Sequence, residues 1–140
     1  MFSAGSHFTE PDLWEELRRE AQRRGFSGTL LAGARSHFTE LNRRQDALPP
    51  DADALTYSIT PQMHATEVPH IVESLPMQRL TALNALRIGS GKPLHVGPVT
   101  LKARFNAVST DGAYDAGTAE AMTTDPLQGC LLYTSDAADE

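Results

Sequence analysis

Polar and charged side chains follow three apolar segments of the sequence, at the places where buried strands would end. In parallel α/β folds, functional groups gather at the carboxyl ends of the strands, so these side chains are candidate site residues. The candidates are His37, Glu40, Asn42 and Arg43 after the first segment, Gln62 and His64 after the second, and Thr100, Lys102, Arg104 and Asn106 after the third. If the three strands are neighbours, these groups converge.

Glu40 and His64 are the two candidates for catalytic acid–base chemistry. A carboxylate at a strand end can act as a general acid or base. A histidine titrates near neutral pH and can serve as a base or as a hydrogen-bond donor to a substrate. Each residue also has a simpler interpretation. Glu40 could form an ion pair with Arg43, Arg44 or Arg104 that only holds a loop, and His64 could be an ordinary loop histidine.

The substrate-binding candidates carry amide or guanidinium groups, and they are Asn42, Arg43, Gln62, Arg104 and Asn106. Such groups hold carboxylates and hydroxyls through directed hydrogen bonds. Loop packing is the alternative role for Arg104 and Asn106. We assign His7, His70 and His95 to structural roles, because none of them follows a predicted strand with partners at hand.

Helical and extended patterns alternate around these candidates. A helix is expected from Pro11 to a stop at Gly25, with Thr9 as its capping residue and an apolar stripe that includes Trp14. A buried strand over 29–33 is expected to continue as a polar extension to 42. A helical turn and loop should follow over 42–50.

Further strands are expected over 54–60 and 94–99, with a helix over 69–87 between them. Pro76 lies inside that helix and should kink or split it. The residues expected on its inner side are Ile71, Val72, Leu75, Leu83 and Leu86. A long polar loop should follow Asn106.

Strands that alternate with helices predict an α/β fold with a parallel sheet and crossover helices. A (β/α)8 barrel needs about 250 residues, and the chain has 140. We therefore expect a partial (β/α)8 TIM barrel domain over 1–129, with about three parallel strands and no closure.

Composition and missing motifs exclude several classes of function. The net charge of −6 gives no support to nucleic-acid binding, and no apolar run is long enough to cross a membrane. The single cysteine allows no intrachain disulfide, which fits a cytoplasmic protein. The sequence has no glycine-rich phosphate loop, no His-Glu-x-x-His and no Gly-x-Ser-x-Gly, so we expect no cofactor and no metal. Oligomeric state is left open.

Three segments together resemble the D-apionate lactonase family. They are Phe38-Thr39-Glu40-Leu41-Asn42-Arg43, the run from Thr56 to Ala65, and the run from Gly97 to Asn106. The likeness covers roughly residues 28–107, while 1–27 do not match clearly. The family pattern also usually has a proline soon after Arg-Phe-Asn, where this chain has Ala107. The resemblance implies a glycosidase-like TIM barrel that hydrolyses a sugar-acid lactone, a small carbohydrate substrate, with Glu40 and His64 in acid–base roles.

Two other functions are kept open. The parent protein could be a TIM-barrel glycoside hydrolase in which Glu40 is the acid/base, with a second carboxylate on a strand absent here. Alternatively, the chain could be an inert fragment or part of a non-catalytic carbohydrate-binding barrel. In each case we expect the 140-residue chain alone to be inactive.

Two further features concern the ends of the sequence. Residues 130–140 read Cys-Leu-Leu-Tyr-Thr-Ser-Asp-Ala-Ala-Asp-Glu and back-translate to something like a transposase-type library adapter, so we expect an artefactual, disordered tail. Near the start, Ser-His-Phe-Thr-Glu occurs at 6–10 and again at 36–40. That spacing fits one βα unit, but two copies do not establish a repeat family, and we interpret the second copy as a coincidence or as an assembly error near the start.

Overall fold

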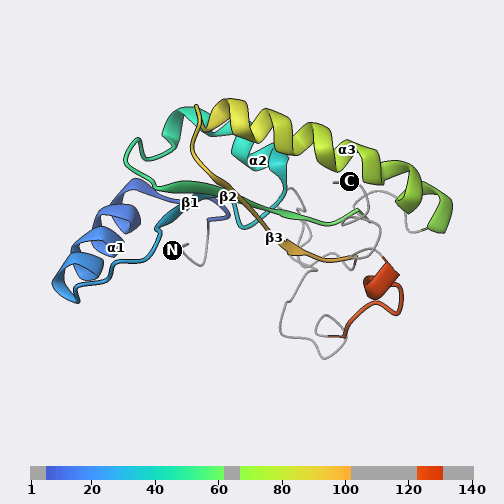
Figure 1. Ribbon diagram of the computed structural model, residues 1–140, viewed down its shortest axis with the longest axis horizontal. Helices are drawn as coiled ribbons and strands as arrows, with labels where there is room; N and C mark the ends of the chain where they lie inside the picture. The colour runs from blue at the N-terminus through green and yellow to red at the C-terminus, as the bar shows by residue number, and fades with distance from the viewer. Residues whose placement is uncertain (1–5, 62–66, 102–122, 131–140) are drawn as a thin grey trace.

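The computed structural model describes residues 6–61, 67–101 and 123–130. Its centre is a parallel sheet of three strands in the order β1-β2-β3. The elements along the chain are α1 (Pro11–Arg23), β1 (Leu31–Gly33), α2 (Phe38–Arg43), the 3-10 helix η1 (Gln45–Ala47), β2 (Ala54–Ile59), α3 (Val68–Ile88) and β3 (Leu94–Val99). The helices α2 and α3 lie together along one side of the sheet, and α1 lies at the β1 end (Figure 1).

This arrangement confirms the predicted α/β class with parallel strands and crossover helices. Both strand pairs are parallel, and β2 is the central strand. Among the residues that the structure describes, no strand pairs with the outer edge of β3, so the sheet is open there. The strand expected over 94–99 has those bounds, and the strand expected over 54–60 is one residue shorter.

α1 forms where the sequence predicts it, but the predicted cap is wrong. Glu10 precedes the helix and makes no capping hydrogen bond with its side chain. Thr9 is fully buried and bonds to Gly33 instead: its backbone N–H donates to the Gly33 carbonyl at 2.9 Å, and its Oγ1 accepts from the Gly33 N–H at 3.0 Å. The Thr9 hydroxyl, which local spacing predicted to cap the helix, therefore forms a long-range hydrogen bond with β1 instead. At the other end, Gly25 has a φ of +63° and ends α1 as predicted.

β1 is much shorter than predicted, because its expected polar extension folds as α2. Phe38 and Leu41 stand three residues apart, so a helix places both on one face. Leu41 is fully buried, and the Phe38 ring meets the Tyr57 ring edge-on with 5.8 Å between the ring centroids. Packing against β2 therefore favours the helix over an extended strand. The expected helical turn after Asn42 is present as η1.

The main core lies between the sheet and the helices α2 and α3. Tyr57 of β2 is 1% exposed, and its hydroxyl lies 3.1 Å from Thr81 Oγ1 of α3. Burial raises the pKa of the Tyr57 hydroxyl. The buried residues of this core are Phe8, Ala34, Leu41, Tyr57 and Ala85. A second cluster joins Trp14 of α1 to Ala32 and Ala52 at the other end of the sheet.

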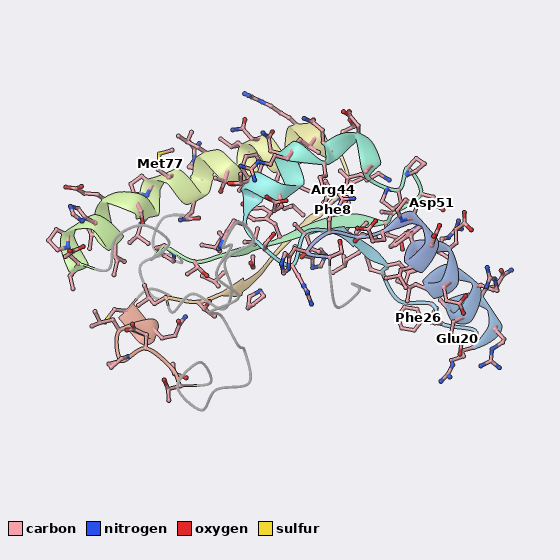
Figure 2. The ribbon with its side chains drawn as sticks, turned by 180° about the vertical axis from the view of Figure 1, so that it is seen from behind. Phe8, Glu20, Phe26, Arg44, Asp51 and Met77 are labelled. Carbon is pink, nitrogen blue, oxygen red and sulfur yellow. The ribbon has the colours of Figure 1, made fainter. Side chains whose placement is uncertain are left out.

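α3 is one helix with Pro76 inside it, so of the two effects predicted for Pro76, a kink or a split, the split is wrong. The expected inner face is only partly correct. Ile71 and Leu75 pack against the sheet side, but Val72, Leu83 and Leu86 are exposed, at 57%, 39% and 42%. Apolar residues occur on several sides of α3, so their spacing does not define one inner face. Met77 also lies on the side of α3 that faces away from the strands (Figure 2).

Replacing Pro76 with alanine is expected to stabilise α3. A proline in a helix interior cannot donate to the carbonyl one turn earlier and costs up to about 3 kcal/mol relative to alanine. Pro76 is exposed and makes no contact that alanine would lose in the core. Pro69 lies in the first turn of α3, where the missing N–H costs nothing, so Pro69→Ala is the matched control. Amide hydrogen exchange across α3 should slow in Pro76→Ala alone; equal protection in both variants would contradict the prediction.

Candidate active site at the carboxyl end of the sheet

The loop from β1 to α2 is fastened to β2 at the carboxyl end of the sheet. The Ser58 N–H donates to the Ser36 carbonyl at 2.8 Å, and Ser58 Oγ donates to the Arg35 carbonyl at 3.2 Å. One step earlier, the Ala34 N–H donates to the Thr56 carbonyl at 2.9 Å. The start of α2 is therefore held beside the carboxyl ends of β1 and β2, where parallel folds place their functional groups.

Glu40 lies in the first turn of α2 rather than on a strand. Its side chain is 20% exposed, and its Oε1 accepts from Arg43 Nη1 at 2.7 Å. This ion pair is one of the two interpretations that the sequence left open for Glu40. It does not decide between them, because an ion pair can either hold the helix or orient a catalytic carboxylate.

Asn42 and Arg43 lie in the last turn of α2, and both are exposed. The Asn42 carbonyl accepts from Gln45 Nε2 at 3.1 Å, which joins α2 to η1. Arg43 contacts Glu40 through one guanidinium nitrogen, Nη1. The substrate-binding roles of Asn42 and Arg43 stay predictions.

Residues 6–10 lie along the free edge of β1. Phe8 forms an antiparallel bridge with Ala34, and its ring is 1% exposed in the main core. The Arg44 guanidinium stands over this ring, 4.7 Å from its centroid, and also pairs with Glu10 at 3.1 Å (Figure 2). Hydrogen bonds from Ser6 and then Arg44 lower the pKa of Glu10. The first copy of the repeated pentapeptide is thus packed against the loop that carries the second.

His7 and Arg35 are brought together at this edge, which sequence reasoning missed. The Arg35 N–H donates to the His7 carbonyl at 3.0 Å, and Arg35 Nε donates to His7 Nδ1 at 3.2 Å. Burial, followed by the charge of Arg35, lowers the pKa of His7, and the negative charge of Glu40 opposes that shift. His7, Arg35 and Glu40 therefore form one polar group at the carboxyl end of β1. The only signal in the sequence was the repeat, since the contacting residues are far apart along the chain.

The ends of β2 and β3 lie side by side. The Thr100 N–H donates to the Ile59 carbonyl at 2.9 Å, and Thr60 Oγ1 lies 3.2 Å from Thr100 Oγ1. The remaining predicted site residues follow these two positions in the sequence but lie outside the described residues; they are Gln62, His64, Lys102, Arg104 and Asn106. The expected loop after Asn106 and residues 131–140 of the tail also lie outside them.

A separate cleft of about 600 Å³ lies between α1 and the segment that precedes β2. Asp51 borders it and accepts from Trp14 Nε1 at 2.8 Å (Figure 2). The cleft is on the amino-terminal side of β2, away from Glu40 and His7, so it is not part of the candidate site. Its lining residues are Pro11, Trp14, Glu15, Arg18, Asp46, Ala47, Leu48, Pro49, Pro50 and Asp51.

In the described part of the chain, no group of three or more His, Cys, Asp or Glu side chains could hold a metal ion. No helix there is long and apolar enough to cross a membrane.

Comparison with known proteins identifies the family. Searches of curated proteins and of solved structures gave no match. A family model described as "D-apionate lactonase, TIM barrel domain" matches residues 1–132. This match includes α1 and the segment 1–27, where the sequence resemblance was unclear. The chain therefore belongs to the D-apionate lactonase TIM barrel domain family.

Proposed function

We propose that this chain is part of a longer enzyme that hydrolyses the lactone of a sugar acid, such as D-apionolactone. The family match is the observation that carries the proposal. It is supported by the position of Glu40, His7 and Arg35 at the carboxyl end of β1, the end at which TIM-barrel enzymes carry their active sites. The three described strands would be consecutive strands of an eight-stranded barrel.

The reaction needs a base for water and a donor for the leaving oxygen. Water attacks the lactone carbonyl and gives up a proton, and a tetrahedral oxyanion forms. The bond from the carbonyl carbon to the ring oxygen then breaks, and the ring oxygen takes a proton. The product is the open hydroxy acid. We assign the two proton transfers to Glu40 and His64 jointly, and substrate positioning to Gln62, Arg104 and Asn106.

The described contacts of Glu40 suit a base. Arg43 engages Oε1, so the ion pair fixes the orientation of the carboxylate. We assign the attacking water to Oε2. The side chain is 20% exposed, which is enough for water to reach it and little enough to limit its motion.

Assays of the full-length parent on two substrate classes test the proposal. Sugar-acid lactones, including D-apionolactone, should be opened, which can be followed by the proton released at neutral pH. Aryl glycosides should not be cleaved. Glycosidic cleavage without lactone opening would overturn the proposal in favour of a glycoside hydrolase, and no turnover of either class would favour a non-catalytic barrel.

The role of His64 is tested by His64→Ala in the same protein. Loss of a general acid or base typically costs about 10²–10⁴-fold in turnover. His95 is an exposed residue of β3 outside the proposed site, so His95→Ala is the control and should keep the parental rate. An unchanged kcat in His64→Ala would remove this residue from the mechanism.

A further inference from the structure

α3 has a second apolar side, opposite the side that packs in the core. Ile71 and Ala85 are buried and mark the inner side of the helix. Successive residues of an α-helix are about 100° apart, so Pro76, nine positions before Ala85, points directly away from the core. Leu80 and Leu83 lie within about 40° of that outward direction, and they are 47% and 39% exposed. α3 therefore presents leucines on the side where a surface helix normally carries polar residues.

The outward residues of α3 follow one another at alternating steps of three and four positions. This spacing is typical of the seam along which two helices pack in a coiled coil. The residues of this outer seam are Glu73, Pro76, Leu80, Leu83 and Arg87. Three more exposed apolar residues flank it, and they are Val72, Leu86 and Met77 (Figure 2). The outer seam thus has an apolar centre, one acidic end and one basic end.

Nothing in the described part of the chain covers the outer seam. In Figure 1, α2 and the strands lie on one side of α3, and no described helix or strand lies on the other. The seam runs for about 21 Å along the helix, which is more than a few scattered surface residues. A continuous exposed apolar surface of this kind marks an interaction site. Since helices form the outer ring of a TIM barrel, this side of α3 stays accessible in a closed barrel.

The charges at the two ends of the outer seam show which partner fits it. Glu73 and Arg87 are both exposed, and each is seven positions from Leu80. If two copies of α3 paired in parallel, Glu73 would meet Glu73 and Arg87 would meet Arg87. If they pair antiparallel about Leu80, Glu73 of each copy meets Arg87 of the other. Arg87 already donates to Asn84 Oδ1 at 3.3 Å through Nη1, but a guanidinium has five N–H donors and can hold both groups.

We propose that the outer seam is the interface of a homodimer, in which α3 packs antiparallel against α3 of a second copy about a two-fold axis at Leu80. Such an interface uses the same surface on both copies. Leu80 then contacts Leu80, Pro76 lies against Leu83, and the pairing of Glu73 with Arg87 occurs twice. One pair of helices is a small interface, so the dissociation constant should be on the order of micromolar. The inference goes beyond the proposed hydrolysis and does not depend on it.

Sedimentation of the full-length parent over a series of concentrations tests the dimer. Leu80→Lys places two ammonium groups together at the axis and should raise the dissociation constant at least about 10²-fold. Leu127→Lys is the matched control, because Leu127 is a similarly exposed leucine, at 40%, outside α3. A wild-type parent that stays monomeric throughout the series would overturn the proposal, as would a Leu80→Lys variant that dimerises like the wild type.

Exchange of the two charges tests the antiparallel arrangement and the identity of the partner. Glu73→Arg and Arg87→Glu each bring like charges together at two places, so each should raise the dissociation constant about tenfold. The variant that carries both substitutions restores opposite charges at both places and should dimerise nearly as tightly as the wild type. A different protein or a neighbouring domain on the seam would not change its own charges in step.

Failure of the double variant to recover would therefore overturn self-pairing. Both residues are exposed, so this comparison remains available if Leu80→Lys does not fold. None of these measurements requires turnover of a lactone. A parent that dimerises as expected but opens no lactone would contradict only the proposed function.

Discussion

Replacing Glu40 with glutamine in the full-length parent is expected to lower kcat for lactone opening by about 10²–10⁴-fold. Glutamine keeps the size of the side chain and can still meet Arg43, but it cannot accept the proton of the attacking water. The substitution therefore removes the base and leaves the packing of α2 nearly unchanged. KM should change much less than kcat, since the carboxylate acts on water rather than on the substrate.

Glu16 provides a closely matched control for this substitution. Glu16 and Arg19 form an ion pair on α1 with the same spacing and the same 2.7 Å distance as Glu40 and Arg43. The difference is exposure: the Glu16 side chain is 59% exposed and the Glu40 side chain is 20% exposed. Glu16→Gln should leave kcat unchanged, because an exposed pair contributes at most about 1 kcal/mol to stability and takes no part in the reaction.

Arg43→Gln separates catalysis from the structural interpretation of Glu40. If the ion pair only holds α2, the loss of either partner should have the same small effect on stability and none on kcat. If Glu40 is the base, Glu40→Gln should lose far more activity than Arg43→Gln. Steady-state kinetics and urea unfolding of both variants provide the comparison. Equal kinetic effects of the two substitutions would remove Glu40 from the mechanism.

The elements that periodicity specifies were predicted well. In α1, Trp14 lies on the apolar stripe and is buried at 4% exposure, and Gly25 ends the helix. The third strand has the predicted bounds, Leu94–Val99, with Gly97 and Pro98 inside it. Such features depend on residues that are near one another in the sequence.

Errors arose where distant contacts decide the local structure. The Thr9 hydroxyl bonds to Gly33 of β1 and does not cap α1. The segment with Phe38 and Leu41 folds as a helix because both side chains then pack in the core that contains Tyr57 of β2. On α3, apolar residues lie on several sides, so only the neighbouring elements determine which of them is buried. None of these partners can be identified from a local pattern.

In the candidate site too, the residue that a local pattern indicates was predicted and the residue that depends on a distant contact was missed. Glu40 was found because it follows an apolar segment, and the structure places it at the carboxyl end of the sheet although on a helix. His7 was assigned to structure because it follows no predicted strand. Its partner Arg35 is 28 positions away, and the antiparallel bridge beside them joins Phe8 to Ala34. The repeated pentapeptide at 6–10 and 36–40 was interpreted as a coincidence or an assembly error, so it did not lead to this contact.

Replacing Gly33 with alanine is expected to destabilise the sheet by roughly 2–4 kcal/mol, the sum of backbone strain and overpacking. Gly33 has a φ of +147°, and a Cβ built there would lie 2.1 Å from the Thr56 carbonyl oxygen. That oxygen belongs to the backbone of β2 and cannot move without separating the strands. Amide hydrogen exchange across β1 and β2 should be faster in Gly33→Ala. Gly129→Ala is the control, because a Cβ at that position meets nothing within 4 Å.

Gly33 also connects this strand contact to the proposed site, which makes the expected effect larger than a loss of stability. The Gly33 N–H and carbonyl both form hydrogen bonds with Thr9, which is two residues after His7 in the chain. A shift of β1 away from β2 should therefore also displace the polar group of His7, Arg35 and Glu40 at the carboxyl end of β1. In the full-length parent we expect Gly33→Ala to lower kcat even in the fraction that remains folded, with faster exchange of the amides of residues 7–9. Normal kcat together with faster exchange in β1 would show that the site does not depend on this contact.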